Sequence, residues 1–443
     1  MQQRLSVYIG ERSERVGTLV YDPARPSVSQ FCYADSWVSQ PNGFAVSPEL
    51  PLLSQWIFLN DAERNSPFPF AFADTEPDSW GRRLIKRSFS KAGHSRGLSE
   101  IDFLLGVEDF SRIGALRFAI DGCQLGESED GRRRTPPLLD LGKIARSSRR
   151  FELDEATDDD LNYHEGKGTS LGGARPKCTV LDEHGNLAIG KFASVNDERS
   201  VVKGEILGLE LARAAGLNAA VGQVVTVDGV NVAVVKRFDR TRLGRRIPYW
   251  SMATFLQCTD NGYPPPSYQL LNEKLFLQAD RSDKSTAKEL FGRLLLNFLI
   301  NNTDDHGRNT GLLMQNNGAW VLSPAFDINP VPLSRPDAPY LSKCYLSSEE
   351  GEMEDVRQLW KCRPAFDLSE DEGIEVFRRV ITAVQNWKTI AVRPKVRMNA
   401  SDLRDYASLF LLSGCKKLLT LLPDLNNFPL REGFLRQSAD FSY

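Results

Sequence analysis

The residues of this chain best suited to chemistry lie together in the stretch Asn301–Asn309. Its sequence, NNTDDHGRN, directly follows an apolar segment and precedes two short apolar runs. Most of these side chains can bind a proton, a metal ion or a phosphate group. A carboxylate can accept the proton of a hydroxyl group, and carboxylate and amide oxygens are the hard ligands that Mg²⁺ prefers. The stretch therefore indicates general-base or magnesium-dependent chemistry.

The spacing of Asp304 and Asn309 matches that of protein-kinase catalytic loops, in which the Asp accepts the substrate proton and the Asn holds Mg²⁺. A third oxygen ligand, Asp327, follows just after the second apolar run. A hairpin formed by the two runs would return the chain to its start, so Asp327 can approach Asn309, like the metal-binding Asp of kinases. The alternative is a polar turn and helix cap made by Asp304, Asp305 and Asn309, and the presence of Asp327 weakens it.

A second group of residues begins at Thr169 in the sequence TSLGGARPK and leads into a predicted strand. Small residues let backbone N–H groups approach phosphate oxygens closely. The loop matches neither a Walker A motif nor the usual kinase glycine loop, and a plain turn explains it equally well. Lys191 lies in the following apolar run, where burying a lysine without an anion is costly. Glu205 stands near the start of the next predicted helix and could orient Lys191.

This order of loop, strand lysine and helix glutamate is that of the N-terminal lobe of a kinase. The alternatives are an edge-strand lysine that points to solvent and an ordinary first-turn helix acid. The segment Val234–Arg240 would then be the hinge, where backbone groups bind adenine. A strand end followed by a basic turn is the simpler interpretation of that segment.

The elements that must position these residues follow from periodicity and turn chemistry. Alternating apolar residues predict strands at Leu5–Ile9 and Val16–Val20, and three- and four-residue spacing predicts helices near Trp80–Phe89 and Ile101–Leu105. Predicted hairpins pair Lys177–Leu181 with Leu187–Phe192, Gln223–Val227 with Val230–Val235 around Asp228-Gly229, and Thr310–Met314 with Ala319–Leu322. Further helices are predicted at Lys203–Ala215, Lys288–Ile300, Ile374–Trp387 and Asp402–Leu421.

The composition is that of a folded protein. The 443 residues are 41% hydrophobic and 26% charged, and the net charge is −3, which argues against a chain that binds nucleic acid over its whole surface. No stretch approaches the ~20 apolar residues of a membrane span, and the N-terminus lacks the apolar region of a signal peptide. Seven scattered cysteines without a C-x-x-C pair argue against a disulfide framework or zinc ribbon. We expect a cytoplasmic protein that does not contact a membrane.

Taken together, these motifs resemble the HipA family of serine/threonine kinases, the toxin halves of bacterial type II toxin–antitoxin pairs. The resemblance covers most of the chain. It rests on these segments: Ser170–Lys177, Lys191-Phe192, Val235–Arg240, Thr303–Asn309, Pro324–Pro330, and in the first part Val16–Leu19, Pro77–Arg82 and Ile113–Leu116.

The resemblance implies an α+β fold of the two-lobed protein-kinase type, with an additional N-terminal α/β subdomain. The implied domains are the subdomain at 1–122, a linker or mobile segment at 123–169, a strand-rich ATP-binding lobe at 170–243 and a helical catalytic lobe at 244–443. The implied cofactors are ATP and Mg²⁺.

The resemblance also implies a role for each site residue. Asp304 would be the catalytic base, Asn309 and Asp327 would hold Mg²⁺, and Ser170 would be the autophosphorylation site whose modification inactivates the enzyme. Glu205 would support the ATP site. The residues that would contact ATP are Gly172, Gly173, Ala174, Arg175, Pro176, Lys177, Lys191, Lys236, Arg237, Phe238, His306 and Asn309.

The implied partners are a HipB-like helix-turn-helix antitoxin, a protein substrate such as an aminoacyl-tRNA synthetase, and DNA reached indirectly through the antitoxin. The basic tract Arg237–Arg246 could contact DNA itself, but solvated surface is the more frequent role of such a tract. Two other functions stay open. The chain could be a kinase-like corepressor with weak catalysis, or a kinase for a small molecule or lipid headgroup.

Overall fold

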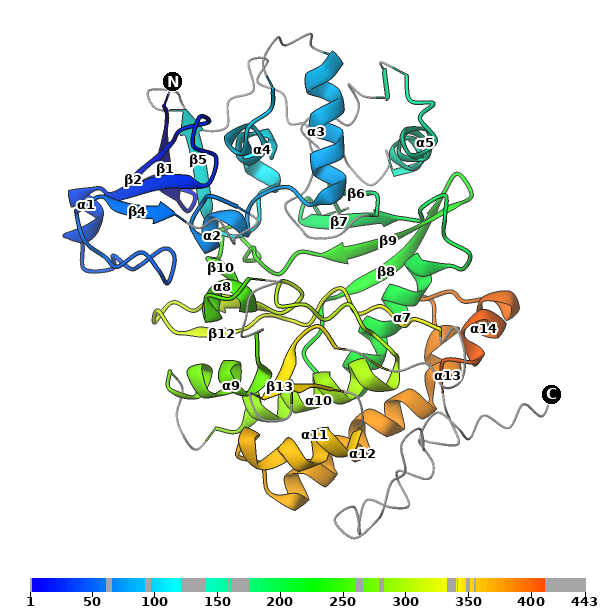
Figure 1. The fold of residues 1–443 in the computed structure, drawn as a ribbon. Coiled ribbons are helices and arrows are strands. Elements are labelled where there is room, and N and C mark those ends of the chain that lie inside the picture. The colour runs from blue at the N-terminus through cyan, green and yellow to red at the C-terminus, as the bar shows by residue number, and fades with distance from the viewer. Residues whose placement is uncertain are drawn as a thin grey trace. The chain divides into compact units, whose positions relative to one another are not determined.

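A computed structural model gives the fold of the chain (Figure 1). The residues that it describes are 2–60, 66–91, 97–120, 141–157, 159–160, 175–182, 184–259, 266–278, 283–332, 340, 342–347, 351–353 and 356–410. The chain divides into two compact units. The first comprises Met1–Asn196, Val225–Thr259 and Leu313–Gln315, and the second comprises Asp197–Val224, Asp260–Leu312 and Asn316–Tyr443. These limits differ from the domain boundaries predicted from the sequence.

The first unit begins with a five-stranded antiparallel sheet in the order β4-β3-β2-β1-β5. The two strands predicted here are confirmed as β1 (Gln3–Ile9) and β2 (Glu14–Tyr21). The other strands are β3 (Val28–Tyr33), β4 (Ile57–Asn60) and β5 (Leu116–Ile120). The helices of this part are α1 (Asp35–Val38), α2 (Phe70–Ala73), α3 (Ser79–Lys91) and α4 (Glu100–Gly106), and α3 and α4 confirm the two predicted helices.

A second sheet of the same unit has the order β6-β7-β9-β8. Its strands are β6 (Lys177–Leu181), β7 (Leu187–Phe192), β8 (Gly222–Val227, in this unit from Val225 onward) and β9 (Val230–Lys236). Asp228 and Gly229 join β8 to β9 with φ angles of 51° and 77°. A two-residue turn with both residues in the left-handed region is what an Asp-Gly pair favours. The predicted hairpin of β8 and β9 is therefore confirmed, and the pairing of β6 with β7 confirms the other.

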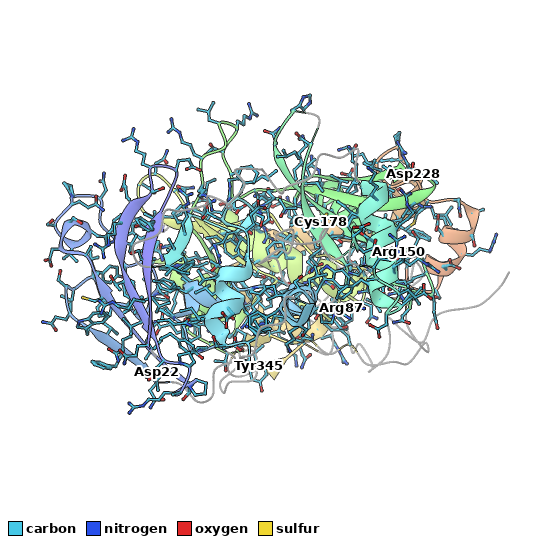
Figure 2. All side chains as sticks on the ribbon, turned by 90° about the horizontal axis from the view of Figure 1, so that it is seen from above. Asp22, Arg87, Arg150, Cys178, Asp228 and Tyr345 are labelled. Carbon is cyan, nitrogen blue, oxygen red and sulfur yellow. The ribbon has the colours of Figure 1, made fainter. Side chains whose placement is uncertain are left out.

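The prediction of a linker at 123–169 is wrong for residues 141–152, which form helix α5 (Leu141–Glu152). Leu141, Ile144 and Ala145 are buried in one core with the apolar residues of the second sheet. Figure 2 labels one residue from each layer, Arg150 of α5 and Cys178 of β6. The apolar residues of α5 are few but spaced three and four apart, and the basic residues of its opposite face hid this pattern in the composition.

The first unit also contains β10 (Tyr249–Ser251) and α8 (Met252–Leu256), neither of which was predicted. The amide of Met314 donates a hydrogen bond of 3.1 Å to the carbonyl of Pro248, which pairs the end of β11 with this segment. Ser251 caps α8, because its hydroxyl accepts from the amide of Thr254 at 3.1 Å.

The second unit is mainly helical. Its helices are α7 (Val201–Ala214), α9 (Tyr268–Phe276), α10 (Ser285–Leu299), α11 (Val356–Cys362), α12 (Glu370–Gln385), α13 (Trp387–Ala391) and α14 (Ala400–Ala407). Its strands are β11 (Gly311–Met314, with Leu313 and Met314 in the first unit), β12 (Trp320–Leu322), β13 (Tyr345–Ser347) and β14 (Gly351–Glu352). The predicted helices at 203–215, 288–300 and 374–387 and the hairpin at 310–322 are confirmed. The helix predicted at 402–421 is α14 as far as Ala407, and residues from 411 lie outside the described part.

The core of the second unit lies between α10 and α12. Phe291 of α10 packs against Phe377 of α12 with ring centroids 5.7 Å apart, and both are fully buried. Because α10 is packed in this core, it provides a fixed support for the polar stretch that follows it.

Among the described residues, none of the helices combines the length and the apolar character that a membrane crossing requires.

Candidate active site

The polar stretch 301–309 is anchored to the end of α10. Asn301 reverses the chain with a φ of 52°, a left-handed conformation that asparagine tolerates better than most residues. The backbone amide of Asn302 donates to the carbonyl of Asn297 at 2.8 Å, and the side-chain amide of Asn302 donates to Oδ1 of Asn297 at 3.0 Å. These bonds fix the start of the loop on the helix.

Two adjacent carboxylates of the loop have opposite environments. Asp305 is buried, and its Oδ1 accepts the backbone N–H of Lys343 at 3.0 Å, while Oδ2 accepts the hydroxyl of Tyr268 at 3.4 Å. Burial, with a smaller contribution from the charge of Asp304, raises the pKa of Asp305 to about 7. The side chain of Asp304 is 55% exposed. Asp304 is therefore the solvent-exposed carboxylate of the two, and Asp305 holds the loop.

Asn309 closes the loop onto Asp304. Its side-chain Nδ2 donates to the carbonyl of Asp304 at 2.6 Å, and its backbone amide donates to the carbonyl of His306 at 2.8 Å. Nδ1 of His306 accepts the backbone amide of Arg308 at 3.2 Å. The structure thus brings Asp304, His306 and Asn309 together. The hydrogen bond from Nδ2 of Asn309 to the loop also fixes the orientation of its side-chain amide oxygen.

Lys343 belongs to this site and was missed in the sequence. Its Nζ forms an ion pair with the carboxylate of Asp304, 39 residues earlier in the chain. The local sequence Ser342-Lys343-Cys344 carries no motif, so only the tertiary structure reveals the contact.

Asp327 lies in a strained and firmly anchored segment. Its φ is 55°, a left-handed conformation that is unfavourable for most residues with a Cβ and that aspartate adopts more readily than most. Two backbone hydrogen bonds anchor Ala325, two residues earlier. Its amide donates to the carbonyl of Asn218 at 2.7 Å, and its carbonyl accepts from the amide of Ala220 at 2.9 Å. Oδ1 of Asp327 accepts from Nδ2 of Asn329 at 3.0 Å. The carboxylate is half-buried and has a fixed orientation.

The donor set of Asn309 and Asp327 fits Mg²⁺. An amide oxygen and a carboxylate are hard ligands, and Mg²⁺ is usually held by one or two carboxylates together with phosphates and water. Within the described ranges, no group of three or more His, Cys, Asp or Glu side chains could hold a metal ion. The meeting of Asp327 and Asn309 at one ion stays a prediction.

In the first unit, Lys191 lies on β7, directly opposite Lys177 of β6 and Ala233 of β9. Because β7 has a neighbour on each side, the alternative of an edge-strand lysine is wrong. Cys178 and Ala188 face α5, and side chains alternate along a strand, so Lys191 points to the opposite face of the sheet. Lys191 is half-buried there.

Lys177 is buried and has an anionic partner, because its Nζ lies 3.0 Å from Oδ2 of Asp78. This ion pair neutralises the lysine within the protein. Of the predicted phosphate loop, Arg175 and Pro176 are described, with Arg175 exposed. Ser170, Gly172, Gly173 and Ala174 lie outside the described residues.

The predicted hinge has a structural role in its own unit. Lys236 is exposed on the α5 face of the sheet, with its Nζ 3.9 Å from Oδ2 of Asp182. Arg237 is buried, and its Nε donates to Oδ1 of Asp239 at 2.8 Å. Phe238 lies near Tyr249, with ring centroids 6.4 Å apart. The side chain of Arg237 is thus engaged by the protein, and contact of these residues with adenine stays a prediction.

The interpretation of the basic tract 237–246 as solvated surface is wrong for Arg237, Arg240 and Arg246. Arg240 donates to Asp239 at 2.6 Å, and Arg246 donates to Asp109 at 3.2 Å. Burial lowers the pKa of Arg240 to about 9 and that of Arg246 to about 10. These three arginines face inward because carboxylates and backbone carbonyls of this unit accept their hydrogen bonds, a pattern that sequence composition does not reveal.

Glu205, the predicted supporting residue, is buried in the first part of α7. The alternative of an ordinary first-turn helix acid is therefore wrong, because α7 begins at Val201 and Glu205 lies beyond its first turn and is buried. A buried glutamate is rare unless it is paired, and the part that Glu205 plays toward Lys191 stays a prediction.

Comparison with known proteins points to one family. Residues 169–387 match the family model of the HipA-like C-terminal domain. The fold is similar to that of HipA from Shewanella oneidensis MR-1, solved in complex with HipB and its operator DNA, with a TM-score of 0.69 and 18% identity over 96% of this chain and 100% of that chain. The proinflammatory kinase CtkA of Helicobacter pylori has a TM-score of 0.42 and 14% identity over 57% of this chain and 94% of its own. The search of curated proteins found no match.

The matched segment 169–387 contains Lys191, Glu205, Asp304, Asn309 and Asp327. The likeness to the Shewanella protein covers nearly the whole chain and confirms the expected α+β class. Residues 169–387 therefore carry a HipA-like C-terminal domain, and the chain has a fold similar to that of the Shewanella HipA.

Proposed function

We propose that the chain is an ATP- and Mg²⁺-dependent protein serine/threonine kinase of the HipA toxin type. The observation that carries this proposal is the structure of the loop 301–309. It exposes the carboxylate of Asp304, buries that of Asp305, and uses Asn309 to hold the backbone of Asp304. This is the arrangement that a positioned general base requires.

In this mechanism Asp304 accepts the proton of the acceptor hydroxyl. Asn309 and Asp327 would hold Mg²⁺, which neutralises charge on the phosphates when it is bound. Lys191 would bind phosphate oxygens, and His306 would lie beside them. Asp305 keeps the loop in place through Tyr268 and the backbone of Lys343.

The chain would phosphorylate a cellular protein, for which the family suggests an aminoacyl-tRNA synthetase, and so arrest translation. Phosphorylation of Ser170 would switch the enzyme off, because about two negative charges beside the phosphate-binding segment would repel nucleotide. The solved complex of the Shewanella HipA with HipB and operator DNA supports a helix-turn-helix antitoxin as the partner of this chain. DNA would be reached through that partner.

The first test is transfer of labelled phosphate from ATP by the wild type and by Asp304→Asn. We expect the variant to lose ~10²- to 10⁴-fold in rate, the usual contribution of a general base. Asp228→Asn is the matched control, since Asp228 is a 57% exposed turn residue of a hairpin. Equal rates for Asp304→Asn and the control would reject Asp304 as the base.

The second test separates the kinase from a corepressor that only binds an antitoxin. Expression should arrest growth, and Asp327→Asn should remove the arrest while it preserves the left-handed backbone that asparagine tolerates. Arrest by the variant at the level of the wild type would favour the binding protein. Phosphoproteomics of the same cells should show a new phosphoprotein and phosphate on Ser170, whereas label confined to small molecules or lipids would favour the third function.

A further inference from the structure

A late segment of the second unit is docked on the loop that carries Asp304. The backbone N–H of Lys343 donates to Oδ1 of Asp305 at 3.0 Å, and Sγ of Cys344 donates to the carbonyl of Asp305 at 3.0 Å. Asp305 and Cys344 are both buried. The backbone of Asp305 and its carboxylate therefore hold this segment from two sides.

The same segment is anchored at two further points. The hydroxyl of Tyr340 donates to the carbonyl of Asn302 at 3.2 Å, and the backbone amide of Tyr345 donates to the carbonyl of Pro266 at 2.9 Å. None of these anchors uses the side chain of Lys343. The position of its Cα is thus fixed by the fold, and the side chain is left to reach Asp304.

The side chain of Lys343 contributes little to holding the fold together. In the ion pair between its Nζ and Asp304, the side chain of Lys343 is 53% exposed and that of Asp304 is 55% exposed. Exposed ion pairs generally contribute little to stability, because water screens them and ordering the side chains costs entropy. The pair nevertheless places an ammonium group against the solvent-exposed carboxylate of the loop.

We propose that Lys343 is a further catalytic residue, whose ammonium group binds the phosphoryl group that is transferred at Asp304; this inference rests on the proposed kinase function. In the transfer, the acceptor oxygen forms a bond to the γ-phosphorus as the bond from that phosphorus to the β–γ bridging oxygen breaks. The electron pair of the broken bond leaves with ADP, and the hydroxyl proton passes to Asp304. Negative charge on the phosphoryl oxygens is stabilised by a cation that the fold has already positioned.

The test compares the full-length wild type with Lys343→Met and Lys343→Arg. Release of labelled phosphate from ATP to water and labelling of the chain itself give kcat and KM, and direct titration gives the Kd for ATP. We expect Lys343→Met to lower kcat by ~10²-fold with KM and Kd for ATP within about threefold of the wild type. Lys343→Arg, which keeps the charge, should recover at least about a tenth of the wild-type kcat.

Lys395→Met is the matched control. Lys395 belongs to the same unit, is 45% exposed, and has its Nζ 3.6 Å from Oε1 of Glu210. It should retain the wild-type kcat. Thermal unfolding midpoints of Lys343→Met and Lys395→Met that equal that of the wild type will show that the fold is intact.

The outcomes separate the two proposals. If the wild type transfers phosphate and Lys343→Met keeps at least half of its kcat, the role of Lys343 is refuted and the kinase function stands. A fall in kcat matched by an equal weakening of the Kd for ATP would also refute it, because the lysine would then serve nucleotide binding alone. A wild type that neither labels itself nor releases phosphate would remove the kinase function together with this inference.

Discussion

At the scale of single residues, Asp304 and Asp305 show how far neighbouring carboxylates can diverge. The sequence identifies both as candidates for chemistry. Their difference arises from Tyr268 and Lys343, which lie 37 and 38 residues away along the chain from Asp305. No local pattern encodes such contacts, so the burial of Asp305 and the presence of Lys343 could not be predicted.

Asp305 should make the stability of the protein depend on pH. Its pKa is raised by burial from 3.8 to about 7, so the folded state keeps a proton that the unfolded state releases. The stabilisation of the fold by protonated Asp305 is fully present below pH 3.8, the ordinary pKa, and is lost as the pH rises through 7. Between pH 3.8 and 7, the free energy of unfolding should fall by at most roughly 1.4 kcal/mol per pH unit.

Asp305→Asn cannot titrate and should remove this slope. Urea unfolding of the wild type and the variant from pH 4.5 to 7.5 measures it. Among the described residues, the charge of Asp304 and the hydroxyl of Tyr268 act on the pKa of Asp305, and both groups stay in the variant. Identical slopes for the two proteins would show that Asp305 is not the titrating group.

At the scale of elements, prediction succeeded where the signal is local and failed where it depends on packing. The hairpin around Asp228-Gly229 has a turn chemistry that only a few residue pairs satisfy, and its strands were predicted within one residue of their bounds. Helix α5 was missed, because its amphipathic pattern lies in a segment dominated by charge. Strand β10 consists of three residues that gain their pairing only from the folded unit.

Helix α5 should therefore contribute to stability as a core element. Ile144 is fully buried against the second sheet, so Ile144→Ala should lower the free energy of unfolding by about 2–4 kcal/mol. Lys143→Ala on the exposed face of α5 should change it by less than about 0.5 kcal/mol. Urea unfolding measures both variants, and equal effects would contradict the packing of α5.

The close approach of α7 to the segment of Asp327 provides a second prediction. A Cβ on Gly208 would lie 2.3 Å from the backbone oxygen of Ile328, which cannot move without moving Asp327. Gly208→Ala should destabilise the fold by about 1–3 kcal/mol and lower phosphate transfer further than the unfolded fraction explains.

Gly292→Ala is the control for this close approach. The nearest atoms to its Cβ would be side-chain atoms, Cδ2 of Leu217 at 2.7 Å and Cγ1 of Val376 at 3.4 Å, and the leucine side chain can rotate away. Thermal unfolding and phosphate transfer measured on both variants separate the two effects. Loss of activity in proportion to stability for both would show that α7 does not position Asp327.

At the scale of the molecule, the most informative feature is the buried ionic cluster of the first unit. The carboxylate of Asp239 accepts from Arg237, from Arg240 and from the backbone amide of Gly114 at 2.7 Å. Arg237 also donates to the carbonyl of Arg112 at 3.1 Å. The predicted hinge is thus joined to a segment more than a hundred residues earlier, which explains why the N-terminal part and the second sheet form one compact unit rather than two domains.

Asp239→Asn should be strongly destabilising. It leaves two buried arginines without their carboxylate, for which a loss of about 3–5 kcal/mol is typical. Asp228→Asn, with an exposed ion pair, should cost less than about 1 kcal/mol. Urea unfolding at pH 7 compares the two, and a small effect at Asp239 would contradict the role of the cluster.

The cluster also predicts sensitivity to acid. Burial alone would raise the pKa of Asp239, but the charges of Arg237 and Arg240 outweigh it and hold this pKa far below its ordinary value. The stabilisation is therefore present above the ordinary pKa of an aspartate and is lost as the pH falls toward the lowered value. Unfolding measured from pH 6 down to pH 3 should show a steeper loss for the wild type than for Asp239→Asn.

The docking of 340–345 on the loop has a consequence for synthesis on the ribosome. A nascent chain that has grown only as far as residue 332 already holds Asp304, Asn309 and Asp327, but Tyr340, Lys343 and Cys344, which fasten the loop, have not yet been added. The loop therefore acquires its final geometry only when this later stretch has emerged. In the proposed function, an unfinished polypeptide would therefore lack the finished site.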